Sequence, residues 1–342
     1  MIHKDNEGLE MLESIRTNNF KIGLGVDCAL DEYVRYKQTQ FTVLAGHANV
    51  GKTTAILYYF LLLALKHGKK FIIFSSENDV WSIKDDLITF KIGKSIKGIT
   101  PKELKAQNYW VNKHFKFIDA DEFLLKNKRL MNFRDIFSTT FEAYGLHDFD
   151  ADALVIDPYN SLGRVEDIKG NTHEYDYQVM GEFRAWCKQQ DKALYLLAHG
   201  NTEALRKVYN KSHEFEGHTI PLQSADIEGG GKFVNRCDCF IVIHRMPQHD
   251  ELWNQTEWRV MKNKVNKTGG KQTFKDNPVI MEMGNTSSTF SCYVRQTNRD
   301  CPPPSVIDPI NLIKEKQQQP KKIEFNTNFE NESNLSNSDI PF

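Results

Sequence analysis

The residues with the clearest chemistry form a glycine-rich loop in the N-terminal third of the chain. The loop follows the pattern G-x-x-x-x-G-K-[ST] and consists of Gly46, His47, Ala48, Asn49, Val50, Gly51, Lys52 and Thr53. Apolar stretches at 41–45 and 54–65 flank it, which predicts a buried strand before it and a long helix after it. In that setting the backbone N–H groups and the helix N-terminus surround a phosphate. The pattern therefore predicts a nucleoside triphosphate site, the alternative being a glycine-rich turn that binds nothing.

Two side chains of this loop are expected to act on the nucleotide directly. Lys52 would reach the β- and γ-phosphates, and the Thr53 hydroxyl would ligate Mg²⁺. Thr54, the next residue, completes the expected nucleotide-binding segment. ATP and Mg²⁺ are accordingly the expected cofactors.

Three titratable side chains, Glu77, Asp157 and His199, stand at the ends of apolar stretches that are expected to be strands. Ligands of an open α/β sheet sit at the carboxyl ends of its strands, so all three should lie beside the loop. We expect Asp157 to hold the Mg²⁺ shell through water, Glu77 to act as general base on the attacking water, and His199 to hydrogen-bond the γ-phosphate. The alternatives are a helix N-terminal acid for Glu77 and a structural histidine for His199.

Two lysines separated by one residue, Lys262 and Lys264, close a later apolar stretch. Alternate side chains of an extended strand point the same way, so both could reach one phosphate group. The alternative is a solvated basic turn.

Composition places the chain among ordinary globular proteins. It has 342 residues, of which 40% are hydrophobic and 26% charged, enough for a large core. The longest apolar run, 55–65, is too short to cross a bilayer, and no leader is visible, so we expect a cytoplasmic protein without a membrane partner. The net charge of −1 means that nucleic acid would have to be met by local basic patches. The six cysteines lack zinc spacing and are expected to be reduced thiols.

The order of the apolar stretches predicts an α/β fold. Strands are expected at 41–45, 71–74, 115–119, 153–157, 193–199, 239–244 and 258–262, and helices at 54–65, 80–110, 131–144 and 173–190. Strands that alternate with long helices predict a mostly parallel sheet with helices on both faces. The last two strands lie closer together in sequence and are expected to be added at an edge.

Six segments occur in a fixed order and together carry a family resemblance. They are 46–53, 74–77, 154–157, 193–199, 226–245 and 262–269. The series resembles the ATPase domain of DnaB-type hexameric replicative helicases and their phage relatives, within the RecA-like superfamily, over roughly residues 19–295. The resemblance implies a RecA-like P-loop ATPase core.

The resemblance also implies a role for each site residue. Lys52 and Thr53 become the nucleotide residues, Glu77 the catalytic base, Asp157 the metal-shell carboxylate and His199 the γ-phosphate sensor. Residues 200–228 become a DNA loop that faces a central channel. The basic residues expected to contact DNA in it are Arg206, Lys207 and Lys211.

One position departs from the family pattern. The family usually has Lys-x-Arg where this chain has Lys262 and Lys264, and the Arg serves as a finger into the neighbouring subunit's ATP. Lysine supplies the charge without the bidentate fork. We expect both lysines to complete the active site of the adjacent subunit, although Lys-x-Lys is also similar to RecA-type recombinases.

The function expected from these features is that of an ATP-hydrolysing DNA helicase or translocase, active on single-stranded DNA in replication. It would assemble as a homo-oligomer, expected to be a hexameric ring, with ATP at the subunit interfaces. Two alternatives remain open: a RecA-like recombinase filament, and a nucleotide-switched replication loader or adaptor whose slow hydrolysis times release.

We expect three regions along the chain: an N-terminal helix or arm at 1–18, the ATPase core at 19–300, and a disordered tail at 301–342. Leu9, Leu12 and Ile15 give the N-terminal region a single apolar face. After 301–304 the composition changes to Asn, Gln, Lys, Glu and Ser, which is typical of disorder.

The last four residues are Asp339, Ile340, Pro341 and Phe342. They are similar to the Asp-Ile-Pro-Phe terminus of bacterial single-stranded-DNA-binding proteins. We expect this segment to dock replication proteins that recognise such tails, with a basic group taking the acidic charge and an apolar pocket taking the phenyl ring. The alternatives are coincidence, or a tail that folds back onto its own core.

Overall fold

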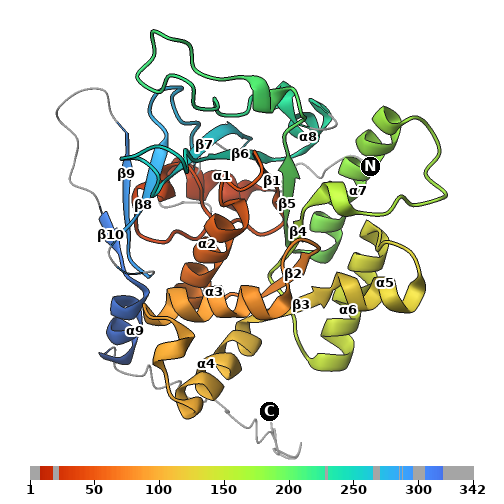
Figure 1. Ribbon diagram of the computed structural model, residues 1–342. Coiled ribbons are helices and arrows are strands. Elements are labelled where there is room, and N and C mark those ends of the chain that lie inside the picture. The colour runs from red at the N-terminus through yellow and green to blue at the C-terminus, as the bar shows by residue number, and fades with distance from the viewer. Residues whose placement is uncertain are drawn as a thin grey trace, which may run out of the picture.

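A ten-stranded sheet, in the order β10-β9-β8-β7-β6-β1-β5-β4-β2-β3, organises the chain (Figure 1). The computed structural model describes residues 8–17, 23–227, 230–264, 270–284, 286, 288–295 and 305–318. Within these residues, no helix is long and apolar enough to span a membrane.

Six neighbouring strands of the sheet are parallel. They are β1 (Phe41–Gly46), β2 (Phe71–Ser75), β3 (Phe115–Asp119), β4 (Ala153–Asp157), β5 (Ala193–His199) and β6 (Cys239–His244). All six coincide with strands predicted from the sequence. β1 lies between β5 and β6, so the glycine-rich loop that follows it emerges near the middle of the sheet.

The rest of the sheet is antiparallel and extends it beyond β6. It consists of β7 (Gln255–Asn263), β8 (Val279–Met283), β9 (Phe290–Val294) and β10 (Ser305–Ile307). The sequence predicted β6 and β7 as strands added at an edge, which is wrong: β6 lies between β1 and β7, and β7 lies between β6 and β8. The three strands that follow β7 were not predicted, and they move the edge of the sheet out to β10.

Helices cover both faces, as predicted. The helices are α1 (Leu9–Arg16), α2 (Lys52–His67), α3 (Val80–Ile92), α4 (Pro101–His114), α5 (Ala120–Asn127), α6 (Phe133–His147), α7 (Thr172–Gln190), α8 (Lys232–Arg236) and α9 (Pro309–Gln318). Short 3₁₀ turns lie at Ala29–Glu32, Ile96–Gly98, Tyr159–Ser161, Ala204–Arg206 and Ser224–Asp226. One apolar core holds side chains of α2, α3 and α4, and the other holds those of α6, α7 and α8.

Helix α2 explains how the glycine-rich loop is held. Its residues 55–65 are all buried, because the sheet and the neighbouring helices surround it, as expected for a helix that is apolar on every side. It begins directly after Gly51 and ends before Gly68, and both glycines have left-handed backbones, with φ of 82° and 67°.

The predicted helix at 80–110 is wrong as one element. Gly93 has a φ of 72° and ends α3, and a new helix starts at Pro101 behind a capping box formed by Thr100 and Glu103. The Gly93 position is crowded as well, since an added Cβ would lie 2.7 Å from the Ser288 hydroxyl oxygen.

The predicted disorder from residue 301 onward is wrong for 305–318. This stretch forms β10 and α9, and α9 packs beside α2 and α3 through Leu312 and Ile313 (Figure 1). Asp308 caps the helix by accepting a hydrogen bond from the Ile310 N–H at 2.9 Å, and Pro309 takes its first position. The prediction used composition, which is polar here, and did not consider Asp308 and Pro309 as the start of a helix.

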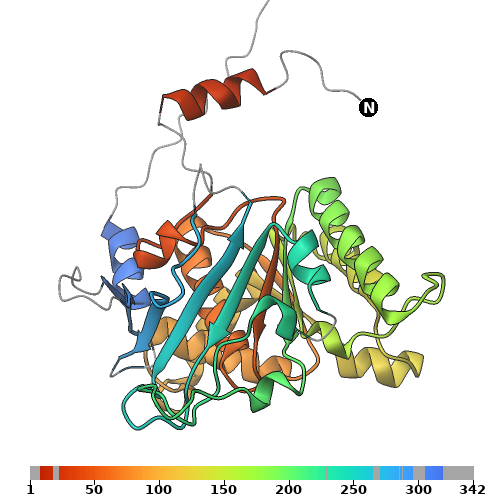
Figure 2. The ribbon, with the colours of Figure 1, turned by 90° about the horizontal axis from the view of Figure 1, so that it is seen from above.

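Helix α1 falls within the predicted N-terminal arm. Figure 2 shows it standing apart from the sheet and its covering helices. The side chains of Leu9 and Leu12, two of the three residues of the apolar face predicted there, are exposed.

Candidate active site

The glycine-rich loop connects β1 to α2 with the geometry that a phosphate site needs. At Gly46 an added Cβ would lie 2.7 Å from the Ile243 carbonyl oxygen, so β6 leaves room only for glycine. Asn49 and Gly51 have positive φ values of 61° and 82°. The loop therefore turns its backbone sharply into the N-terminus of α2, where N–H groups lack partners within the helix.

The Lys52 ammonium lies inside this loop. It donates to the carbonyl oxygens of Gly46 at 3.3 Å and His47 at 2.9 Å, and the residue is 6% exposed. Burial lowers the pKa of Lys52, while the nearby carboxyl groups of Asp157 and Glu77 act to raise it. The cation is thus held within the loop by oxygen atoms of the loop itself.

Thr53 and Asp157 form a second contact of the site. The Thr53 hydroxyl donates to Asp157 Oδ2 at 2.6 Å, and Asp157 is 1% exposed at the end of β4. Burial raises the pKa of Asp157 to about 6. The other oxygen, Oδ1, is buried without a hydrogen-bond partner among the described residues. A hydroxyl beside an unpaired carboxylate oxygen is a ligand set that fits Mg²⁺.

Glu77 and His199 extend the site toward β2 and β5. His199 Nε2 lies 3.0 Å from Glu77 Oε1, and Nδ1 of the same ring lies 3.2 Å from Lys52 Nζ. The Glu77 side chain is 49% exposed, so water reaches it, while the imidazole is largely covered. The structure thus brings together Lys52, Thr53, Glu77, Asp157 and His199, as the sequence predicted.

Lys262 and Lys264 lie at the other end of the sheet. β7 runs antiparallel to β6, and Cys239, the first residue of β6, pairs with Asn263. Lys264 Nζ contacts Asp238 at 3.1 Å, and Lys262 donates to the Val234 carbonyl oxygen. Because the glycine-rich loop follows the opposite ends of the parallel strands, neither lysine reaches the site of its own chain.

The loop predicted to bind DNA begins directly after His199. Short bridges pair Gly200 with Ile227 and Val208 with Thr219, which gives the loop a hairpin-like base. Arg206 and Lys211 are exposed. Residues 228 and 229, at the end of this loop and just beyond it, lie outside the described residues.

Lys207 differs from the other two basic residues of this loop. Its ammonium forms an ion pair with Asp226, which is buried. The Asp226 carbonyl oxygen also accepts a hydrogen bond from the Asn201 N–H at 2.7 Å. Lys207 thus helps to close the base of the loop, a role that the sequence did not predict.

Two further contacts near the loop were missed. Arg245 follows β6, and its Nη1 would lie 4.0 Å from a Cβ placed on Gly51, beside a cavity of about 30 Å³. The imidazole of His47 bridges to the Ile220 carbonyl oxygen at 3.1 Å, so the phosphate loop touches the DNA loop. The only sequence signal for Arg245 was its place at the end of a predicted strand.

The predicted docking residues Asp339, Ile340, Pro341 and Phe342 lie outside the described residues, and their role stays a prediction.

Two solved structures share the fold. The chain matches a structure described as an ATPase domain with a TM-score of 0.62 and 15% identity, over 85% of this chain and 99% of that one. It matches a DnaB-like replicative helicase, whose interactions with primase were described with it, with a TM-score of 0.59 and 14% identity, over 85% of this chain and 67% of that one. At these identities the likeness shows the fold. The predicted α/β fold, a mostly parallel sheet with helices on both faces, is confirmed.

Sequence comparison adds one distant relative. No family model matches the chain. The Twinkle homolog protein, chloroplastic/mitochondrial, of Arabidopsis thaliana is 24% identical over 247 residues. The match covers 67% of this chain and 31% of the relative, so the chain spans less than a third of that protein.

Proposed function

We propose that this chain is an ATP-driven helicase or translocase that acts on single-stranded DNA. The observation that carries the proposal is the continuous set of contacts from Lys52 through His199 to Glu77, beside the contact of Thr53 with Asp157. A phosphate loop, a carboxylate open to water and a buried carboxylate with a free oxygen are the groups that ATP hydrolysis needs. The fold shared with DnaB-like helicase ATPase domains supports the same activity.

Each side chain has a defined task in this reaction. The loop backbone and Lys52 bind the β- and γ-phosphates, and Thr53 with Asp157 would hold Mg²⁺, which neutralises phosphate charge when bound. The Glu77 carboxylate accepts a proton from the water whose oxygen bonds to the γ-phosphorus. The bond between the γ-phosphorus and the bridging oxygen breaks, so ADP leaves with that oxygen and inorganic phosphate forms. His199 keeps that carboxylate in place by donating from Nε2.

Assembly supplies the remaining charge. Lys262 and Lys264 lie at the end of the sheet opposite the phosphate loop, so one copy can present them to the γ-phosphate held by the next copy. Such a head-to-tail contact generates a ring when it closes and a filament when it does not. We propose a hexameric ring, with the exposed Leu9 and Leu12 side chains of α1 contributing to the contact between copies.

DNA would be bound by the loop at 200–227. Arg206 and Lys211 offer exposed charge to the phosphate backbone, whereas Lys207 shares its charge with Asp226. Because this loop follows His199 and touches His47, loss of the γ-phosphate can be reported to it from two points. We further propose that the segment Asp339–Phe342 docks replication proteins that recognise the tails of single-stranded-DNA-binding proteins.

One observation favours a recombinase as the second candidate. Lys-x-Lys stands where DnaB-type proteins usually have Lys-x-Arg, and a lysine cannot form the bidentate contact of an arginine. A recombinase would form long filaments on DNA and pair strands without unwinding them.

The decisive experiment is an ATPase assay with and without single-stranded DNA, coupled to a fork-unwinding assay. We expect DNA-stimulated turnover and ATP-dependent unwinding, both absent in the Lys52→Ala variant. Stimulated turnover with strand pairing and no unwinding would identify the recombinase. Slow turnover that DNA does not stimulate would identify the loader or adaptor instead.

A further inference from the structure

A buried ion pair joins α7 to α8. The Lys232 ammonium, at the first position of α8, lies 3.3 Å from Asp176 Oδ2 in the first turns of α7, and the two side chains are 7% and 8% exposed. Replacing such a pair by apolar residues of similar volume is often neutral for stability, whereas removing one partner is costly. Stability alone therefore gives little reason for a charged contact at this place.

The same carboxylate holds a third group. The Tyr159 hydroxyl donates to Asp176 Oδ1 at 2.7 Å. Burial raises the pKa of Tyr159, and the Asp176 charge raises it further, so the hydroxyl stays protonated and donates. The Tyr159 ring also packs edge-on against Phe233 of α8, with 5.2 Å between ring centroids.

Tyr159, Asp176 and Lys232 thus form a chain of contacts, and its two ends, Tyr159 and Lys232, lie in different regions of the protein. Tyr159 follows Asp157 with one residue between them, so it moves with the backbone that carries the buried carboxylate. Lys232 follows the end of the candidate DNA loop, after Gly230, whose φ of 76° turns the chain into α8. Asp176 thus connects the strand end at the ATP site with the exit of the loop.

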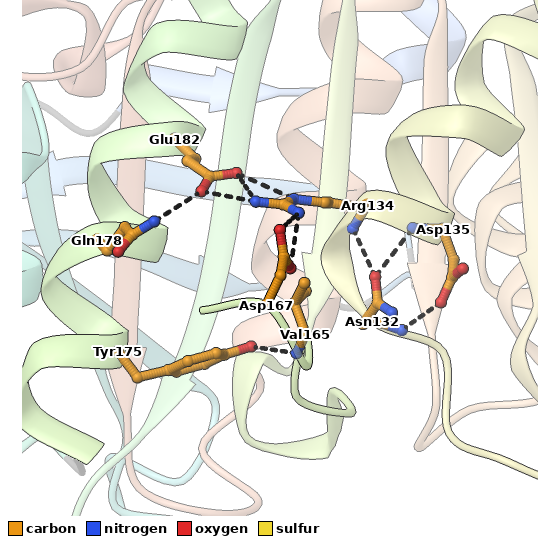
Figure 3. Close-up of polar contacts among 8 residues, drawn as sticks. All are labelled: Asn132, Arg134, Asp135, Val165, Asp167, Tyr175, Gln178 and Glu182. Atoms are coloured by element: carbon orange, nitrogen blue, oxygen red, sulfur yellow. Dashed lines mark hydrogen bonds and ion pairs between the residues drawn. The ribbon is translucent and has the colours of Figure 1, made fainter. Parts of the chain in front are cut away.

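The segment after Tyr159 is fixed to α7 by further contacts (Figure 3). The Tyr175 hydroxyl accepts a hydrogen bond from the Val165 N–H at 3.0 Å. Arg134 of α6 bridges Asp167 at 2.7 Å and Glu182 of α7 at 3.0 Å. These contacts join the segment after Asp157 to α7, so a displacement of Asp176 would be passed to the backbone beside the ATP site.

We propose that Tyr159, Asp176 and Lys232 are positioning residues that couple DNA binding to ATP turnover. The inference rests on the proposed function, because it needs a DNA-stimulated ATPase. DNA that displaces the loop shifts Lys232, and the buried charge pair cannot separate without a large penalty, so Asp176 and Tyr159 follow. The end of β4, with Asp157, is thereby moved relative to the phosphate loop.

The test removes the contacts among Tyr159, Asp176 and Lys232 while keeping side chains of similar volume. The Asp176→Leu/Lys232→Met double variant removes both charges together, and Tyr159→Phe removes only the hydroxyl. We expect both to fold and to keep the basal ATPase rate, with a lower melting temperature because each leaves a buried oxygen without its partner. The stimulation by single-stranded DNA should fall at least about fivefold in the double variant. Coupling between two binding free energies is reciprocal, so in the double variant the effect of a non-hydrolysable ATP analogue on DNA affinity and the effect of DNA on the affinity for that analogue should fall by one common factor.

A matched control lies on the same pair of helices. Arg236 of α8 stacks over the Tyr177 ring of α7, 4.0 Å from its centroid, but contacts neither Asp176 nor Tyr159 through a described hydrogen bond. Arg236→Met should retain wild-type stimulation, and Lys232→Arg, which keeps the charge, should retain most of it.

The outcomes separate the two proposals. A wild-type protein that DNA does not stimulate overturns the proposed function. A stimulated wild type with equal stimulation in the double variant and in Tyr159→Phe overturns the inference alone. If the double variant does not fold, Tyr159→Phe decides, and a normal stimulation ratio there counts against the link.

Discussion

At the scale of single residues, His199 connects the two charged groups of the site. An ammonium can only donate, so Nδ1 of the ring must accept from Lys52 and the ring proton must lie on Nε2, which then donates to Glu77. A γ-phosphate that draws Lys52 forward removes the donor from Nδ1. The imidazole is therefore able to respond to the phosphate at a position directly before the candidate DNA loop.

Replacing the Glu77 carboxylate tests the base. Glu77→Gln should bind ATP normally and hydrolyse it about 10²–10⁴-fold more slowly, because the amide cannot accept the proton of the attacking water. Fluorescent-nucleotide binding and steady-state turnover measure the two effects. Lys52→Ala serves as the contrast, since it should lose nucleotide binding itself. Wild-type turnover in the Glu77 variant would rule out this assignment.

The buried carboxyl of Asp157 should make stability depend on pH. Its pKa is raised from 3.8 to about 6 in the folded chain, so the folded state binds the proton more tightly than the unfolded state. Its contribution to stability is therefore complete below the unfolded pKa and is lost as the pH rises through about 6, by roughly 3 kcal/mol.

The measurement is urea unfolding without Mg²⁺ between about pH 3.5 and about pH 7.5. This range includes both the unfolded pKa of Asp157, 3.8, and its folded pKa of about 6. The free energy of unfolding of wild type should fall relative to that of Asp157→Asn as the pH rises. The variant is the control, since an amide keeps an oxygen for Thr53 and does not titrate. Parallel curves would contradict the raised pKa.

The sequence alone was sufficient to predict the placement of site residues that lie at or just after the end of a strand. Lys52, Glu77, Asp157 and His199 each follow or close an apolar stretch, and parallel strands necessarily bring such ends to one edge. Arg245 and Lys207 could not be predicted in the same way. Their partners, the Trp253 carbonyl oxygen and Asp226, depend on how loops fold over the sheet, and no local pattern encodes that.

At the scale of elements, the sequence predicted those helices and strands whose residues form one continuous apolar run. The six parallel strands are short, mostly apolar runs, and α2 is a long one, so each was recognisable alone. β8 and β9 mix polar and apolar residues because only some residues of each strand are buried, and α9 is brief and polar. Their stability comes from packing against β7, α2 and α3, which sequence periodicity does not report.

The candidate DNA loop gives a prediction that separates its three basic residues. Arg206→Ala and Lys211→Ala should each reduce the log–log salt dependence of single-stranded DNA binding by about 0.7, the value for one phosphate contact. Fluorescence anisotropy at several salt concentrations measures the slope. Lys188→Ala, an equal charge change in the last turn of α7, should leave it unchanged.

Lys207→Met should act differently from these two. Its removal leaves the Asp226 carboxylate buried without its cation, so the base of the loop should open and affinity should fall without a matching change of slope. Equal slopes in wild type and the Arg206 and Lys211 variants would place the DNA track elsewhere on the protein.

At the scale of the whole molecule, the phosphate loop and the two lysines proposed to act on ATP lie at opposite ends of the strands. The phosphate loop follows the carboxyl end of β1, while Lys262 and Lys264 lie near the start of β6, where β7 ends. Under the proposed function, a chain with this arrangement would not complete its own site, and a second copy placed head to tail would supply the two lysines that the first does not bring there. Catalysis and assembly would then be a single property of the protein.

Mixing two inactive variants tests whether the lysines of one copy act at the ATP site of the next. Lys264→Ala keeps its own phosphate site, and Glu77→Gln keeps its lysine, so an interface between them can hold one complete site. Each variant alone should be nearly inactive, and an equal mixture should regain activity at about a quarter of the interfaces formed by random head-to-tail assembly. Loss of Lys264 should leave the fold intact, because Arg184 also contacts Asp238, at 3.3 Å.

The control is a mixture of Lys264→Ala with the Glu77→Gln/Lys264→Ala double variant, which offers no lysine and should recover nothing. Lys264→Arg, which keeps the charge and adds a second donor, should stay active on its own. Mixed assembly is verified by co-purification through a tag on one variant only. If the tagged complexes contain both variants and ATP turnover remains at the level of either one alone, the lysines do not act across the interface.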